Sequence, residues 1–289
     1  MGWVSITVLV GQYHRNIHGS DSLKIPYLNG GLFEEDDKKH RNLIFPSNLF
    51  KNLFDFFNQY NFTIYEDDPN DHTVAVDPEM LGHIFENLLE DNKDKGAYYT
   101  PKEIVHYMCQ ESLIEYCLNY DFSDYGINMI EEEKRNLISN FIKKKEIDIQ
   151  KLQKSSKSNE SYKSWFRQLN NALDSVKICD PAIGSGAFPM GLLHEIFTAK
   201  QTLHYYQKQL ENHSQSNNQT NHSSDNFDAS AVKLNIIQNS IYGVDIEKGA
   251  VDIARLRFWL SLIVDEEKPK ALPNLDYKIV VGNRLGIVN

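Results

Sequence analysis

The sequence contains little cysteine: three residues, Cys109, Cys117 and Cys179, in a chain of 289. Their number is odd, and no two of them form a C-x-x-C pair. This scarcity excludes a disulfide framework and a cysteine-rich zinc site, and it is typical of proteins kept in a reducing compartment. We therefore expect a cytoplasmic protein without a bound metal.

Long apolar runs and an excess of positive charge are also missing. No uncharged stretch approaches the ~20 residues of a membrane-spanning helix. The apolar run at residues 4–10 has no basic residue before it and no A-x-A-like site after it, so it does not predict a signal peptide. The formal net charge is −10. A protein that holds nucleic acid simply by being basic is thereby excluded, and any contact with DNA must be local or made by a partner segment.

The overall amino-acid composition is that of an ordinary globular protein, with 41% hydrophobic and 24% charged residues. The length corresponds to about two domains. Three regions are expected: a mainly helical region at 1–95, a helical segment at 96–175, and a region at 176–289 in which strands alternate with helices. The last region is interrupted at about 205–231 by a polar insert, since residues 211–230 contain five Asn and five Ser but no Leu, Ile, Val or Met.

Hydrophobic periodicity and cap residues predict the individual elements. Helices are expected at 47–60 and 78–89. A further helix is expected to begin at a Thr100/Glu103 capping box with proline in the first turn, and one or two polar helices are expected over 128–175. Strands are expected at 176–179, 241–244 and 278–281, with helices from 187, at 232–239 and at 250–264. The alternation of strand and helix predicts an α/β fold with a doubly wound parallel sheet.

One stretch is locally basic. Residues 134–163 hold nine basic and three acidic residues. Such a charge run is typical of a solvated helix face, and the alternative is a surface that faces phosphates.

The segment at 176–188, VKICDPAIGSGAF, has the strongest functional pattern. A strand ends at Asp180, the chain turns through Gly184 and Gly186, and a helix follows. Paired glycines let the backbone approach a ligand, and ligands of open α/β sheets bind at the carboxyl ends of the strands. A dinucleotide fingerprint is excluded because Pro189 stands where a third Gly or Ala is required, and a P-loop is excluded because the sequence has no Gly-Lys pair.

Two further positions lie at predicted strand ends. Asp245 ends the second strand, where an acidic side chain can accept hydrogen bonds from ribose hydroxyls. Asn283 follows the third strand, and its amide can read an adenine edge. The 65 positions between Asp180 and Asp245 exceed the usual gap of about 20, so a nucleotide site here requires an elaborated crossover.

Several motifs together resemble the S-adenosylmethionine-dependent DNA adenine-N6 methyltransferases of restriction-modification systems, notably the type IIG-like enzymes that fuse restriction and modification. Residues 180–188 resemble the first cofactor motif, DPAxGSGxF. Residues 96–105, GAYYTPKEIV, resemble the motif that precedes it, and residues 241–246 with 250–260 are similar to the second motif. Residues 76–89 also look like this family. The resemblance covers residues 25–285 and implies that 176–289 is the first half of a Rossmann-like, class I methyltransferase domain that binds S-adenosylmethionine.

The resemblance also implies roles for individual residues. Tyr98, Thr100 and Pro101 would contact the methionine end of the cofactor. Asp245 would hold the ribose, with Ile246 packing on the adenine and Asn283 at adenine N6. The amino-acid and sulfonium region would be lined by Asp180, Ala182, Gly184 and Gly186.

The catalytic tetrapeptide of that family, NPP[YF], is absent, since no two of the nine prolines are adjacent. We therefore expect the chain to carry the cofactor-binding half of a DNA methyltransferase, inactive alone, with the catalytic motif beyond Asn289. Double-stranded DNA would be bound mostly by regions outside it, with a specificity domain or fused nuclease in the full-length protein. Two alternatives remain: a helical DNA- or protein-interaction module on a Rossmann-like scaffold, and a methyltransferase acting on RNA or protein.

Overall fold

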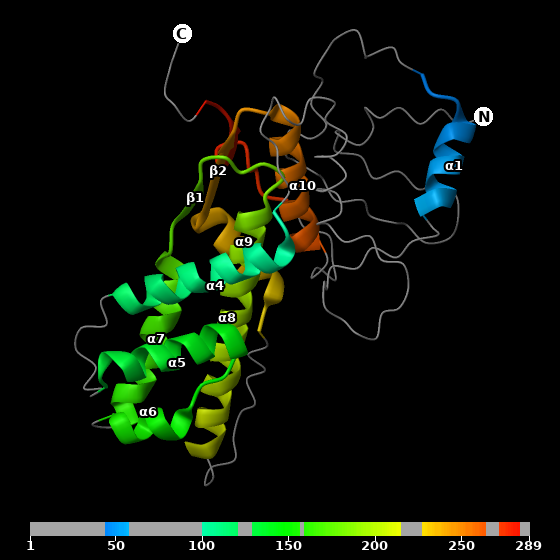
Figure 1. Cartoon of the computed structure of the whole chain (residues 1–289). Helices are drawn as coiled ribbons and strands as arrows, with labels where there is room; N and C mark the ends of the chain where they lie inside the picture. Colours follow the sequence, from blue (N-terminus) through cyan, green and yellow to red (C-terminus); the bar gives the residue numbers. More distant parts are fainter. Residues whose placement is uncertain are drawn as a thin grey trace, which may run out of the picture. The chain divides into compact units, whose positions relative to one another are not determined.

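The computed structural model describes residues 44–57, 100–120, 129–156, 159–214, 227–263 and 272–283 (Figure 1). The expected helix at 78–89 and residue Tyr98 lie outside these ranges. The chain divides into two compact units. We call Thr100–Pro181 with Ala187–Gly243 the helical unit, and Met1–Tyr99 with Ala182–Gly186 and Val244–Asn289 the glycine-loop unit.

The helical unit is built around helices α4 (Lys102–Asn119) and α8 (Ala187–Ser214). The stretch 128–175, for which one or two helices were expected, forms three: α5 (Glu131–Lys144), α6 (Ile149–Ser155) and α7 (Asn159–Ser175). The break after α5 comes from Lys145, which adopts a left-handed conformation with φ 57°. The unit is completed by α9 (Ala229–Asn239). Residues 205–214, assigned from the sequence to the polar insert, continue α8.

Helix α4 packs against α5, α7 and α8 (Figure 1). Its contact with α8 is close because Gly191 has no side chain: a Cβ there would lie 2.9 Å from both Cys109 Sγ and Val105 Cγ1. The core between these helices is mostly apolar. Its largest fully buried side chains are Leu113, Ile114, Ile138, Phe141, Ile142, Leu152, Phe166, Leu169, Leu173, Ile196 and Leu203.

The predicted capping box at the start of α4 is wrong. Pro101 is the N-cap residue, with φ −53° and ψ 141°, and no side chain caps the helix. The Pro101 carbonyl accepts from the amides of Ile104 and Val105. Because the extended proline moves the helix start to Lys102, Thr100 stands one position too far out to act as the cap.

The three predicted strands form one sheet in the order β1-β2-β3. Strand β1 (Ile178–Asp180) pairs in parallel with β2 (Ile241–Asp245), and Asp180 lies in register with Gly243. Strand β3 (Ile279–Val281) lies on the other side of β2, where the Gly282 amide donates to the Asp245 carbonyl at 2.8 Å. The described part of the chain is thus mostly helical with one small three-stranded sheet, which is consistent with the predicted α/β class.

The glycine-loop unit also contains α1 (Ser47–Phe57) and α10 (Lys248–Ile263). Helix α10 packs against β3. The Trp259 indole N–H donates to the Pro273 carbonyl at 3.0 Å, and Arg255 donates from Nε and Nη2 to the Ile279 carbonyl at 3.0 and 2.6 Å. These bonds fix α10 beside the end of the sheet.

Candidate functional site

The glycine loop, residues 182–186, connects β1 to α8. Gly184 and Gly186 have φ values of 52° and 90°, in the left-handed region that residues with a Cβ rarely adopt. The Gly186 amide donates to the Ile183 carbonyl at 2.8 Å, and the Ile183 amide donates to the Val244 carbonyl at 3.0 Å. The two glycines thus serve a tight, defined turn, as the sequence predicted.

The side chain of Asp245 meets this loop. Its Oδ2 accepts from the Gly184 amide at 2.8 Å and its Oδ1 accepts from the Glu247 amide at 2.9 Å. Residues 61 positions apart in the chain therefore lie side by side. A carboxylate offers about four lone-pair sites, so two remain for further donors.

The space next to the loop is open on one side. No described atom lies within 4 Å of where a Cβ on Gly184 would be. Ile246, directly after Asp245, has 72% of its side chain exposed, and Ala182 and Asn283 are exposed too. The combination of a half-buried carboxylate, a bare backbone and an exposed aliphatic side chain fits the hydroxyls and flat base of a nucleoside.

Of the remaining residues singled out in the sequence, Thr100, Pro101 and Asp180 belong to the helical unit, and Tyr98 lies outside the described residues. Asp180 is half-buried at the carboxyl end of β1, and Thr100 with Pro101 directly precedes α4. The candidate site residues that belong to the glycine-loop unit are Ala182, Gly184, Gly186, Asp245, Ile246 and Asn283.

Arg257 on α10 also contacts the loop, and it was not singled out from the sequence. Its side chain is only 4% exposed, and its Nη1 donates to the Ser185 carbonyl at 3.0 Å. The sequence carried a signal for it: Arg257 stands between Ala254 and Phe258, on a helix face whose other buried members are mostly apolar.

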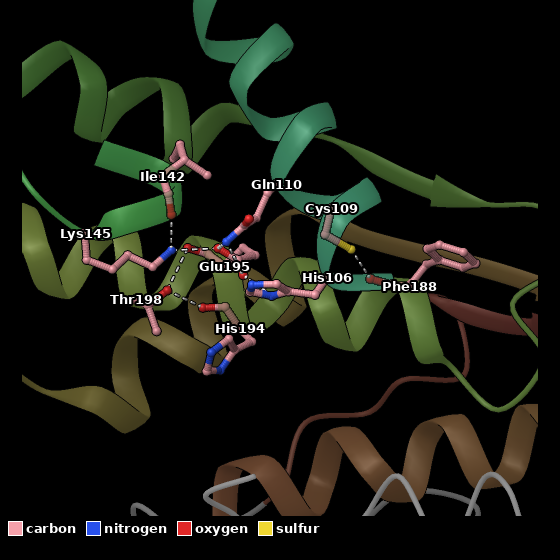
Figure 2. Close-up of polar contacts among 9 residues, drawn as sticks. All are labelled: His106, Cys109, Gln110, Ile142, Lys145, Phe188, His194, Glu195 and Thr198. Atoms are coloured by element: carbon pink, nitrogen blue, oxygen red, sulfur yellow. Dashed lines mark hydrogen bonds and ion pairs between the residues drawn. The ribbon is translucent and has the colours of Figure 1, made fainter. Parts of the chain in front are cut away.

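A second polar cluster lies in the helical unit and centres on Glu195 of α8. Figure 2 shows the side chains of His106, Gln110 and Lys145 directed at this carboxylate. Glu195 is 1% exposed. It accepts from His106 Nδ1 at 2.8 Å, Lys145 Nζ at 2.6 Å and Gln110 Nε2 at 3.4 Å. This Glu195 cluster ties α4 and the end of α5 to α8.

Two residues at the Glu195 cluster have unusual properties: Lys145 in its backbone conformation and Cys109 in its pKa. Lys145 is the only described non-glycine residue with positive φ, and its ammonium also donates to the Ile142 carbonyl at 2.6 Å. Cys109, whose thiol donates to the Phe188 carbonyl at 3.5 Å, is 2% exposed. Burial, and then the charge of Glu195, raises the pKa of Cys109 to about 12. The second buried thiol, Cys117, has its pKa raised by burial to about 12.

These values predict the thiol chemistry of the folded chain. At pH 8 a thiol of pKa about 12 is roughly one part in ten thousand thiolate, the reactive form. We expect a thiol reagent at pH 8 to modify the exposed Cys179 rapidly and the other two cysteines only on unfolding. Titration in native buffer and in guanidinium chloride checks this, with Cys179→Ser as the control that removes the fast phase. Two or three fast thiols in native buffer would contradict it.

Four of the nine basic residues in the locally basic stretch form ion pairs within the chain. Arg135 pairs with Glu115, and the side-chain hydrogen bond from Arg135 lowers the pKa of that carboxyl. In the same unit three further lysines of the stretch pair with carboxylates: Lys143 with Glu111, Lys145 with Glu195, and Lys151 with Glu133. This pairing favours the solvated helix face over a surface that faces phosphates.

Two classes of feature are missing from the part of the chain that the structure describes. No helix there is sufficiently long and apolar to cross a lipid bilayer. Nor do three or more His, Cys, Asp or Glu side chains gather there in a way that would hold a metal ion.

Comparison with known proteins adds one relative. No family profile and no solved structure matches the chain. The chain is 34% identical over 274 residues to a protein of Methanocaldococcus jannaschii named "Putative type II restriction enzyme and methyltransferase". The match covers 90% of this chain and 21% of that protein, so the chain is similar to about a fifth of its relative's length.

Proposed function

We propose that this chain is the cofactor-binding part of an S-adenosylmethionine-dependent DNA adenine-N6 methyltransferase of a restriction-modification system. The observation that carries the proposal is the hydrogen bond between the Gly184 amide and the Asp245 carboxylate, which joins two motifs that are separate in the sequence. The similarity to a protein named as both restriction enzyme and methyltransferase supports it. The adenine specificity rests on the motif resemblance.

In this proposal the residues of the glycine-loop unit hold the nucleoside. Asp245 accepts from the ribose hydroxyls with the lone pairs that Gly184 and Glu247 leave open. Ile246 provides an apolar surface for the adenine, and Asn283 reads its polar edge. When bound, S-adenosylmethionine supplies an electrophilic methyl group. By resemblance, Gly186 and Ala182, with Asp180, Tyr98, Thr100 and Pro101, serve the amino-acid end.

The sheet order β1-β2-β3 agrees with one half of a doubly wound, Rossmann-like domain. The proposal includes double-stranded DNA as the substrate, with a specificity domain or a fused nuclease elsewhere in the full-length protein. The interaction-module alternative is less favoured because four of the nine basic residues in its basic stretch are paired within the chain.

Two measurements test the proposal. The 289-residue chain is expected to bind S-adenosylmethionine in isothermal titration calorimetry. It is expected not to methylate DNA, because it lacks an NPP[YF] tetrapeptide. The full-length enzyme, given cofactor with a tritiated methyl group and duplex DNA, is expected to yield labelled N6-methyladenine after digestion to nucleosides. Label in cytosine, RNA or protein instead, or no cofactor binding by the chain, would overturn the proposal.

A further inference from the structure

The guanidinium of Arg257 is a buried charge on a helix face that is mostly apolar. Its side chain is 4% exposed, and the buried residues of α10 around it are Ala250, Val251, Ala254, Phe258, Trp259, Leu262 and the polar Ser261. Arg257 Nη1 donates a hydrogen bond to the Ser185 carbonyl at 3.0 Å. Both residues belong to the glycine-loop unit.

Stability alone does not account for this arginine. Removing a charged group from water is costly, and an apolar side chain of similar volume in its place is often neutral or stabilising. The same helix already has another anchoring arginine, Arg255, which bonds the Ile279 carbonyl and pairs with Asp276 at 3.1 Å, Nη1 to Oδ1. Arg257 also donates a hydrogen bond to the glycine loop, at a carbonyl that the bonds to the three loop amides leave untouched.

The position of Ser185 makes that bond significant. It lies between Gly184 and Gly186, whose backbones have access to more conformations than any other residue type. The bonds from Ile183, Gly184 and Gly186 fix three amides of the loop, and the bond from Arg257 fixes the orientation of the peptide group between positions 185 and 186. A loop that populates its binding shape only part of the time binds its ligand correspondingly more weakly.

We propose that Arg257 is a positioning residue that holds the glycine loop in the shape that receives the nucleoside. The inference rests on the proposed function, since it assigns that nucleoside to S-adenosylmethionine. If Arg257 holds the loop in this shape, it does so without ligand as well, and the dynamics of the ligand-free loop can be measured.

The test compares Arg257→Met with the matched control Arg255→Met. In Arg257→Met the dissociation constant for S-adenosylmethionine, measured by calorimetry, is expected to rise about ten-fold, as for loss of one hydrogen bond to a charged group. In the ligand-free variant, hydrogen exchange at the Gly184 and Gly186 amides is expected to accelerate while the amides of α10 keep their protection. Arg255→Met is expected to lower the urea midpoint and to change the dissociation constant less than two-fold.

Arg257→Lys provides a second variant if the methionine variant does not fold. It keeps the charge and one donor, and its affinity is expected to lie between those of wild type and Arg257→Met. Unchanged affinity in both variants, or unchanged exchange in the loop, would overturn the role of Arg257. If wild type itself fails to bind S-adenosylmethionine, the proposed function fails first and this assignment with it.

Discussion

Replacing Glu195 by alanine is expected to lower the free energy of unfolding by about 3 kcal/mol, the lower end of what breaking a buried ion pair costs. Lys145, His106 and Gln110 would all lose the acceptor they share, and the missing side chain would leave a void beside Cys109. The cost stays at the lower end because Lys145 and His106 are 29% and 53% exposed and can turn toward water. Urea unfolding followed by circular dichroism measures the change.

Two variants separate the charge from the shape. Glu195→Gln keeps the volume and one acceptor oxygen, so a smaller loss of about 1–2 kcal/mol is expected, comparable to one hydrogen bond to a charged group. Glu115→Gln removes a carboxylate whose pair with Arg135 is exposed to solvent, and the urea midpoint is expected to stay where it is. An alanine variant at position 195 as stable as wild type would show that the Glu195 cluster does not hold the helices together.

Replacing Asp245 by alanine is expected to weaken S-adenosylmethionine binding ten- to a hundred-fold. The carboxylate holds the Gly184 amide at 2.8 Å and the Glu247 amide at 2.9 Å, and in the proposed function it also accepts from the ribose hydroxyls. Hydrogen bonds to charged groups contribute roughly 1.5–3 kcal/mol each, which corresponds to this range of affinity. Calorimetric titration of the chain measures it.

Asp245→Asn keeps one acceptor oxygen and is expected to fall between alanine and wild type. The matched control is Asp252→Ala on α10, the helix that follows Asp245. The Asp252 side chain is 38% exposed, and its Oδ1 lies 3.8 Å from Arg255 Nη1. Its affinity is expected to equal that of wild type. An alanine at 245 that binds the cofactor as tightly as wild type would remove Asp245 from the ribose role.

The order and type of the α/β elements could be predicted because their signals are local. The strand at 178–180 precedes a glycine turn, the helix at 187 follows it, and the strand at 241–245 ends at an acidic residue. Boundaries that depend on a single backbone conformation could not be predicted. Lys145 splits a basic stretch into separate helices by a left-handed turn that is usual for glycine, and Pro101 displaces the expected cap.

In the candidate site too, contacts with a local sequence signal could be predicted and contacts made by helix packing could not. Gly184 and Asp245 were both expected at one bound cofactor, at the carboxyl ends of the strands, and the structure joins them by a hydrogen bond. Glu195 was not singled out because its partners at 106, 110 and 145 lie 50 to 89 positions away and reach it only through the packing of helices. Arg257 contacts Ser185 across 72 positions for the same reason. Charged residues within an apolar helix face are the signal to look for.

The interleaving of the two units has a consequence for how the protein is made. The chain passes between them four times, after residues 99, 181, 186 and 243. During synthesis the glycine loop leaves the ribosome well before the Val244 carbonyl, the Asp245 carboxylate and the Arg257 guanidinium that hold it. Its final shape therefore forms only after some seventy further residues have been translated, and a fragment that stops at residue 243 would carry the loop without its supports.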